Sequence, residues 1–232
     1  MVLVIGGTRG TGSLIVRSLE RQKVPVRVLA RGRAKAVALF SSSVEVIAGD
    51  ITQPHTLPHA IRGASHIVFT AGCRSGHPVG EAQIRTTEYE GVLNTLTAAR
   101  DAGFDGRFLY MTSSGVHARS FWSISLNLYK GNTLVWRARA EAEIRASGLA
   151  YTIIRTGVLL NRAVGTHPIR LTQEPLPLSP FYRIARADVA EAFVAALDHP
   201  RTIRTTFEIA WARREPRQSW LALMQSLKQD GD

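Results

Sequence analysis

The residues most able to do chemistry stand at the start of the chain, in a glycine-rich turn. An apolar run, Val2–Gly6, leads into this turn, and a stretch with helical apolar spacing follows it. Glycines allow positive φ angles and a close approach of backbone to a pyrophosphate, while a helix N-terminus offers free N–H groups and the positive end of its dipole. The order strand, turn, helix therefore predicts a dinucleotide site. The contributing residues are Gly6, Gly7, Thr8, Arg9, Gly10, Thr11 and Gly12.

The second predicted strand indicates which dinucleotide is bound. In NAD-preferring domains this strand usually ends on an acid, about 20 residues past the glycines, that holds the ribose 2′-hydroxyl. Here Arg31 and Arg33 follow the strand, and the next acidic residue is Glu45. Guanidinium groups form paired, charge-assisted hydrogen bonds with phosphate, so these arginines favour NADP(H), with Arg9 as a candidate third contact. The alternative is that Arg31 and Arg33 are solvated surface side chains.

Apolar strands alternate with amphipathic helical stretches along the chain, which is typical of βαβ units around a parallel sheet. The predicted strands are Val2–Gly6, Val24–Ala30, Val44–Ala48, His66–Ala71, Arg107–Thr112, Ala150–Arg155 and Thr206–Ala210. The predicted helices are Gly10–Gln22, Thr56–Arg62, Glu81–Ala102, Asn132–Ser147, Ala187–Asp198 and Arg217–Lys228. Residues 157–184 contain four prolines and no clear period. We expect a single domain, 1–232, in which this segment is either a loop-rich lobe on the substrate side or a surface insertion.

Composition and charge narrow the class of protein. The chain has 232 residues, of which 45% are hydrophobic and 20% charged, as in ordinary globular domains. No apolar run approaches the roughly 18 residues of a membrane span, and Cys73 has no second cysteine to pair with, which favours a reducing compartment. The net charge of +11 suits a phosphorylated dinucleotide, but its basic residues are scattered rather than gathered in an arm. We predict a cytoplasmic monomer or homodimer that binds neither nucleic acid nor membrane.

Seven motifs follow one another along almost the whole chain. They are VLVIGGTRGTG, VRVLAR, VIAGDIT, FTAG, FLYMTSSG, AEAEIRASGLAYTIIRTGVL and RIARADVAEAFVAAL. In their order and spacing they resemble the atypical short-chain dehydrogenases/reductases of the NmrA-like, NAD(P)H-binding group. The resemblance implies an α/β fold with a Rossmann-type, doubly wound parallel sheet of about seven strands. It also implies that NADP(H) or NAD(H) is the cofactor.

The same resemblance implies roles for residues that follow the central strands. Asp50 and Ile51, after the third strand, would lie against the adenine. Ala71 and Gly72 would end the fourth strand beside the dinucleotide. Ser113 follows the fifth strand and would stand at the nicotinamide end. A metal site is not expected, because the seven histidines show no ligand spacing with cysteine or acid partners.

The chain departs from the family at the catalytic pair. Reductases of this superfamily use Tyr and Lys, spaced YxxxK, in which Tyr donates the proton and Lys lowers its pKa and holds the ribose. Counting back from SGLAYTIIR places Thr133 and Arg137 at these positions. Threonine is no useful acid near neutral pH, and Arg137 can hold a ribose but stays charged. Tyr129, beside Lys130, would share the face of Thr133 if the helix reached back that far, and His117 is a further candidate donor.

Three functions remain open. The first is an NADPH-dependent oxidoreductase acting on a small, apolar carbonyl, enone, quinone or flavin, with Ser113, Tyr129 and Arg137 as catalytic candidates and Ser113 and Arg137 also contacting the cofactor. The second is a regulator or redox sensor whose contacts with a partner follow the NADPH/NADP ratio. The third is an isomerase or cyclase that keeps the nucleotide fold for a non-redox reaction. Fold alone does not choose between them.

Overall fold

A sheet of eight strands forms the centre of the computed structural model, which describes residues 1–73, 79–212 and 216–231. The strand order is β3-β2-β1-β4-β5-β6-β10-β8, and every neighbouring pair is parallel except β10 and β8. The bounds are β1 Val2–Ile5, β2 Val26–Ala30, β3 Glu45–Ala48, β4 His66–Phe69, β5 Arg107–Ser113, β6 Ala150–Thr156, β8 Ile169–Thr172 and β10 Thr205–Trp211. The α/β, doubly wound prediction is confirmed, with β8 as the additional antiparallel edge strand.

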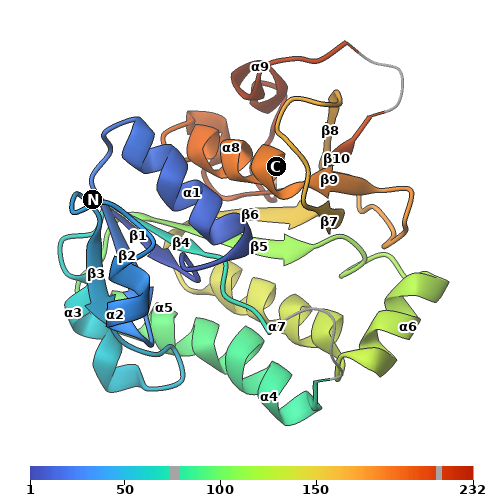
Figure 1. Cartoon of the computed structure of the whole chain (residues 1–232). Helices are drawn as coiled ribbons and strands as arrows, with labels where there is room; N and C mark the ends of the chain where they lie inside the picture. The colour runs from blue at the N-terminus through green and yellow to red at the C-terminus, as the bar shows by residue number, and fades with distance from the viewer. Residues whose placement is uncertain (74–78, 213–215, 232) are drawn as a thin grey trace.

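Helices cover both faces of this sheet (Figure 1). On one face α1 (Gly10–Arg21) packs against α8 (Arg186–Ala196), with α9 (Trp220–Met224) beside them. On the other face lie α3 (Leu57–Ile61), α5 (Gly91–Asp101) and α7 (Thr133–Ala146). The strands are apolar along their length because both faces are buried: Leu3 and Val4 of β1 are each 0% exposed and belong to the two different cores.

The predicted helix Glu81–Ala102 is divided into three parts. They are α4 (Glu81–Arg85), a π-helical turn η2 (Thr86–Glu90) and α5. A π-turn adds a residue to one helical turn and often occurs at functional sites. In this chain it carries the buried side chain of Glu88 toward α7, a neighbour of η2.

A break in helical structure separates α6 (Phe121–Tyr129) from α7. Gly131 and Asn132 both adopt positive φ angles, 45° and 59°. A side chain at Gly131 would collide with the backbone of Glu81, since a Cβ there would lie 2.5 Å from its Cα atom. The helix predicted over Asn132–Ser147 is confirmed as α7, but it does not extend back to Tyr129.

Residues 157–184 contain more regular structure than the prolines suggest. Strand β7 (Val158–Leu160) pairs in parallel with β9 (Arg183–Ala185), and β8 from the same segment joins the main sheet. Shorter elements outside the prediction are α2 (Arg33–Val37) and the 3-10 turns η1 (Pro54–Thr56) and η3 (Pro200–Thr202). Among the described residues, no helix is both long and apolar enough to cross a membrane.

Candidate dinucleotide site

The glycine turn joins β1 to α1 at the carboxyl edge of the sheet. Gly6 has a φ angle of 84°, and a Cβ added to it would lie 2.6 Å from the Ala71 backbone nitrogen. A Cβ on Gly12 would collide with the Gly6 carbonyl oxygen and lie 2.5 Å from Thr70 Oγ1. The turn therefore requires glycine for its own close packing, which brings the start of α1 against the ends of β1 and β4.

The N-terminus of α1 has the properties of an anion site. Among the described residues no side chain caps this helix, and its first turn contains no acidic residue. The Thr11 hydroxyl is buried and has no hydrogen-bond partner in the described part of the chain. Free backbone N–H groups, a positive dipole end and an orphaned hydroxyl together suit a pyrophosphate. The residues of the turn thus fit the phosphates of a dinucleotide.

Two arginines stand beside this turn, and one of them was not predicted. Arg9 donates from Nη2 to the Gly72 carbonyl oxygen at 3.2 Å, so its guanidinium faces the end of β4. A contact of Arg9 with a 2′-phosphate stays a prediction. Arg186, at the start of α8, lies beside Gly10, where an added Cβ would be 3.8 Å from its Nε. The motif RIARADVAEA contains Arg186, but its position beside Gly10 depends on the docking of α8 against α1.

Arg31 and Arg33 follow β2, as expected, and both are exposed. Arg33 donates from Nε to the Val46 carbonyl oxygen at 3.2 Å, which leaves its two Nη groups available. Arg31 makes no hydrogen bond or ion pair within the described residues. These positions stand at the same edge of the sheet as the glycine turn, because β1 and β2 are parallel neighbours.

The residues after β3 and β4 form the flank of the site. Asp50 uses one carboxylate oxygen to accept hydrogen bonds from the backbone and hydroxyl of Thr52, at 2.9 and 3.0 Å. Ile51 is 7% exposed, belongs to the core beneath the sheet and fills the space beside Gly91, while its expected contact with the adenine stays a prediction. Ala71 and Gly72 are half-buried and directly follow β4 in the chain.

A buried carboxylate organises the region around Thr133 and Arg137. Glu88 is 1% exposed. Its Oε2 accepts a hydrogen bond from the Thr133 hydroxyl at 2.6 Å and one from Arg137 Nε at 2.8 Å. Its Oε1 accepts from the backbone N–H of Cys73 at 2.9 Å. The side chains of Thr133 and Arg137 are thus held by one acid that sequence reasoning missed.

The charges of Glu88 and Arg137 are fixed by their contacts. Burial alone raises the pKa of Glu88, but the Arg137 charge and the hydrogen bonds outweigh it and hold this pKa below its usual value. Burial lowers and Glu88 raises the pKa of Arg137, with a net rise, so the guanidinium stays positive. Arg137 also donates to the Met111 carbonyl oxygen at 3.4 Å, and its Nη2 would be 3.0 Å from a Cβ on Gly72. Arg137 is therefore a fixed cation beside the end of β4.

The other predicted donors differ in their surroundings. Ser113 is half-buried and donates to the Ser114 carbonyl oxygen at 3.0 Å. Tyr129 is 47% exposed at the end of α6 and is separated from Thr133 by the break between the helices. His117 is exposed, and its Nε2 lies 3.3 Å from an oxygen of the buried Glu141 carboxylate.

Lys130, the last residue before the break, is 9% exposed. Its ammonium group donates to the Cys73 carbonyl oxygen at 3.4 Å. Burial lowers the pKa of Lys130, the Arg137 charge acts in the same direction, and Glu88 opposes them. A lysine beside a predicted turn gives no sequence signal of burial, which explains why the burial of Lys130 was not predicted.

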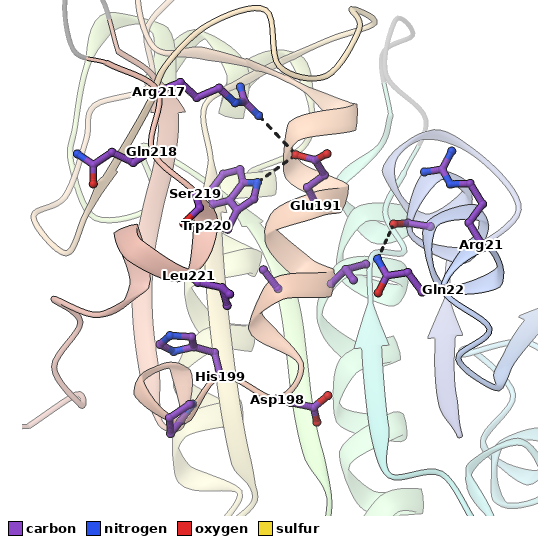
Figure 2. A pocket seen from close by; sticks show the side chains of 14 residues that line it. Arg21, Gln22, Glu191, Asp198, His199, Arg217, Gln218, Ser219, Trp220 and Leu221 are labelled. Carbon is purple, nitrogen blue, oxygen red and sulfur yellow. Dashed lines mark hydrogen bonds and ion pairs between the residues drawn. The ribbon is translucent and has the colours of Figure 1, made fainter.

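A groove of about 950 Å³ lies elsewhere, between the C-terminal half of α1, α8 and residues 217–221 (Figure 2). Arg217 and the indole of Trp220 both hydrogen-bond to Glu191 there. This groove is remote from the glycine turn, because it includes the opposite end of α1. Within the described residues, no group of three His, Cys, Asp or Glu side chains is placed to hold a metal ion.

A family model described as NAD(P)H-binding matches residues 6–200. This range includes the glycine turn, the arginines after β2, the Glu88 network and all of α8. The match agrees with the anion site at the start of α1 and with the topology of the sheet.

Two similar curated proteins are reductases by name. The NAD(P)H azoreductase of Xenophilus azovorans is 28% identical over 86% of this chain, and the match spans 64% of its own length, just under two thirds. The sanguinarine reductase of Eschscholzia californica is 30% identical over 90% of this chain and 88% of its own. Among solved structures, an oxidoreductase from Lactococcus lactis superposes with a TM-score of 0.80 at 17% identity, covering 98% of this chain and 96% of the other.

Proposed function

The chain belongs to the NAD(P)H-binding family, with the fold of the atypical short-chain dehydrogenases/reductases, and we propose that it is an NADP(H)-dependent oxidoreductase that reduces a small apolar molecule. The observation that carries this proposal is the uncapped start of α1 beside the glycine turn, with the buried Thr11 hydroxyl lacking a partner among the described residues. Two similar proteins that are reductases by name support the reaction class.

NADP(H) rather than NAD(H) is supported by the end of β2. Within the described residues, the exposed guanidinium groups of Arg31 and Arg33 make a single hydrogen bond, from Arg33 to Val46, which leaves both able to pair with a 2′-phosphate. No acidic residue occurs between Glu20 and Glu45 to hold an unmodified ribose 2′-hydroxyl. The net charge of +11 acts in the same direction, because it attracts the more highly charged dinucleotide.

Each part of the site has a separate task in this proposal. The residues from Gly6 to Gly12 hold the pyrophosphate, and Asp50, Ala71 and Gly72 flank the dinucleotide. Arg137, oriented by Glu88, binds the ribose at the nicotinamide end, where Ser113 also lies. When bound, the cofactor supplies a hydride. The protein contributes orientation and a positive charge close to the reacting atoms.

An apolar substrate is supported by α6 and by the similar proteins. Phe121, Ile124 and Leu128 of α6 are apolar, yet they are 75%, 56% and 83% exposed. They come only a few residues before Thr133 and Arg137 of the candidate site in the chain. The two relatives are named for reduction of azo compounds and of sanguinarine. A conjugated, apolar acceptor is therefore the substrate class that we propose.

The test combines binding with turnover. Calorimetric titration with NADPH and NADH is expected to give micromolar or tighter binding of NADPH and at least roughly tenfold weaker binding of NADH. NADPH oxidation is then followed with azo dyes, quinones, enones, flavins and simple ketones. Turnover of a conjugated acceptor, with slow or no turnover of simple ketones, is the expected result. Failure to bind either dinucleotide would contradict the whole proposal.

A second function is favoured by one specific observation. The Thr133 hydroxyl is committed to Glu88 at 2.6 Å, so the position that carries the acid in related reductases holds no proton donor. An NADP(H)-dependent sensor would need only the binding half of the site. Tight NADPH binding without turnover of any acceptor, together with a partner protein whose affinity changes with cofactor state, would identify this function.

A further inference from the structure

Lys130 is a cationic side chain at the candidate site that has no role in the proposed binding of the dinucleotide. Lys130 comes from the loop between α6 and α7, yet its side chain is buried and reaches the Cys73 carbonyl oxygen. The N–H of the same residue, Cys73, is bound by Glu88. Lys130, Glu88 and Arg137 thus meet at the backbone that directly follows β4 and Gly72.

We propose that Lys130 is the proton donor of the reduction, and that its ammonium group protonates the substrate atom that takes up negative charge. This inference rests on the proposed function. The usual donor position is occupied by Thr133, whose hydroxyl is already bonded to a carboxylate. Arg137 cannot act as an acid, because a guanidinium does not lose its proton in a protein. Lys130 is an acid whose side chain reaches this cluster, through its contact with the Cys73 carbonyl oxygen.

The protons and electrons of the step balance. The substrate gains a hydride from the bound dinucleotide at one atom and a proton from Lys130 Nζ at the atom that would otherwise carry the charge. The substrate is reduced by two electrons, and the dinucleotide leaves oxidised. The neutral amine of Lys130 then regains a proton from water. No oxidant or metal ion is required.

The charges around Lys130 suit a donor. Arg137 repels its proton from α7, and burial disfavours its charge, while Glu88 on η2 is the counter-charge that keeps the ammonium form populated. The Cys73 thiol is the remaining titratable neighbour, and burial raises the pKa of that thiol, which keeps it neutral. A pKa for Lys130 below its ordinary value brings the ammonium group closer to the pH of the reaction, where a general acid is most effective.

The direction in which turnover changes with pH follows from the protonation state of Lys130 that is active. Only the ammonium form donates, so turnover is expected to fall as pH rises through the lowered pKa of Lys130. The rate of Lys130→Met should be lower, and it should lack this fall at alkaline pH.

Two substitutions separate donation from charge. Lys130→Met is expected to lower kcat by about 10²-fold or more with a conjugated acceptor, and to leave the Kd for NADPH within about twofold. Lys130→Arg keeps the charge but cannot donate, so the same loss is expected. Lys228→Met is the matched control, because that side chain is exposed on the far C-terminal segment. Wild-type kcat in Lys130→Arg would overturn the proposal and assign Lys130 an electrostatic role.

A measurement without turnover completes the test. The chain contains four lysines, at positions 23, 35, 130 and 228, so NMR of protein labelled with 13Cε-lysine gives few signals, assignable by substitution. In ligand-free protein, the Lys130 signal is expected to titrate below the range of a free lysine side chain. Titration at or above that range would overturn the proposal. If the wild type binds NADPH but reduces no acceptor, the proposed function fails and this inference with it; turnover unaffected by Lys130→Met refutes this inference alone.

Discussion

Cofactor preference offers the most direct test of the site, through Arg31→Ala and Arg33→Ala. A hydrogen bond to a charged group contributes about 1.5–3 kcal/mol. Both side chains are exposed, so the lower end of that range applies. We expect Arg31→Ala to weaken NADPH binding by about 1.4 kcal/mol, which is tenfold in Kd. Arg33 shares its Nε with the Val46 carbonyl oxygen, and its removal should have a similar or smaller effect.

The assay is calorimetric titration of each variant with NADPH and NADH at fixed ionic strength. NADH lacks the 2′-phosphate, so its Kd should change by less than about twofold, and the double variant should bind the two dinucleotides almost equally. Arg100→Ala, on the exposed side of α5, controls for the loss of one positive charge. Parallel weakening of NADPH and NADH would refute the reasoning, because it would mean that the arginines do not contact the 2′-phosphate.

Three further substitutions test the packing and charges. Gly12→Ala introduces a Cβ that collides with backbone at Gly6, and should cost about 1–3 kcal/mol of unfolding free energy in urea titrations; an unchanged midpoint would show that the turn adapts. Glu88→Gln leaves the Arg137 guanidinium without its counter-charge and should cost up to about 3–5 kcal/mol, with weaker NADPH binding; unchanged stability and Kd would contradict this network. Hydrogen bonds and arginines lower the pKa of Glu141 to about 2 against burial. Its folded-state pKa lies below the unfolded value, so its contribution of roughly 3 kcal/mol is present at neutral pH and lost as pH falls from about 4.5 toward 2. Glu141→Gln should reduce the fall in unfolding free energy over this acidic range. An unchanged fall in the variant would refute this role of Glu141.

The predictable parts of the fold are those whose burial follows from the residue types of neighbouring positions in the sequence. Strand β1 reads VLVI and is buried throughout, and the seven predicted strands all occur in the sheet with bounds within about two residues. The helix after the glycine turn also begins where the turn predicts, at Gly10. In both cases, local sequence and tertiary burial require the same conformation.

Short elements were not predicted, because tertiary contacts rather than local sequence define them. Strands β7 and β9 are three residues each and pair with one another across more than twenty residues of chain. Helix α6 begins with a capping box between Ser120 and Ser123, but its exposed apolar side chains give no amphipathic period.

The Glu88 network illustrates a different limit of sequence reasoning. Glu88 and Arg137 are 49 positions apart, and the π-turn that aims Glu88 inward leaves no mark in the apolar spacing of Glu81–Ala102. Counting motifs assigned Thr133 and Arg137 to the family's Tyr and Lys positions and presented them as an incomplete catalytic pair. In the structure both side chains donate hydrogen bonds to Glu88, and Thr133 is 3% exposed. The half-buried Arg137 needs such a carboxylate, since an unpaired charge in this position would be costly. The three residues therefore form one interdependent set, and once the set is in place, any acid for catalysis must come from outside it.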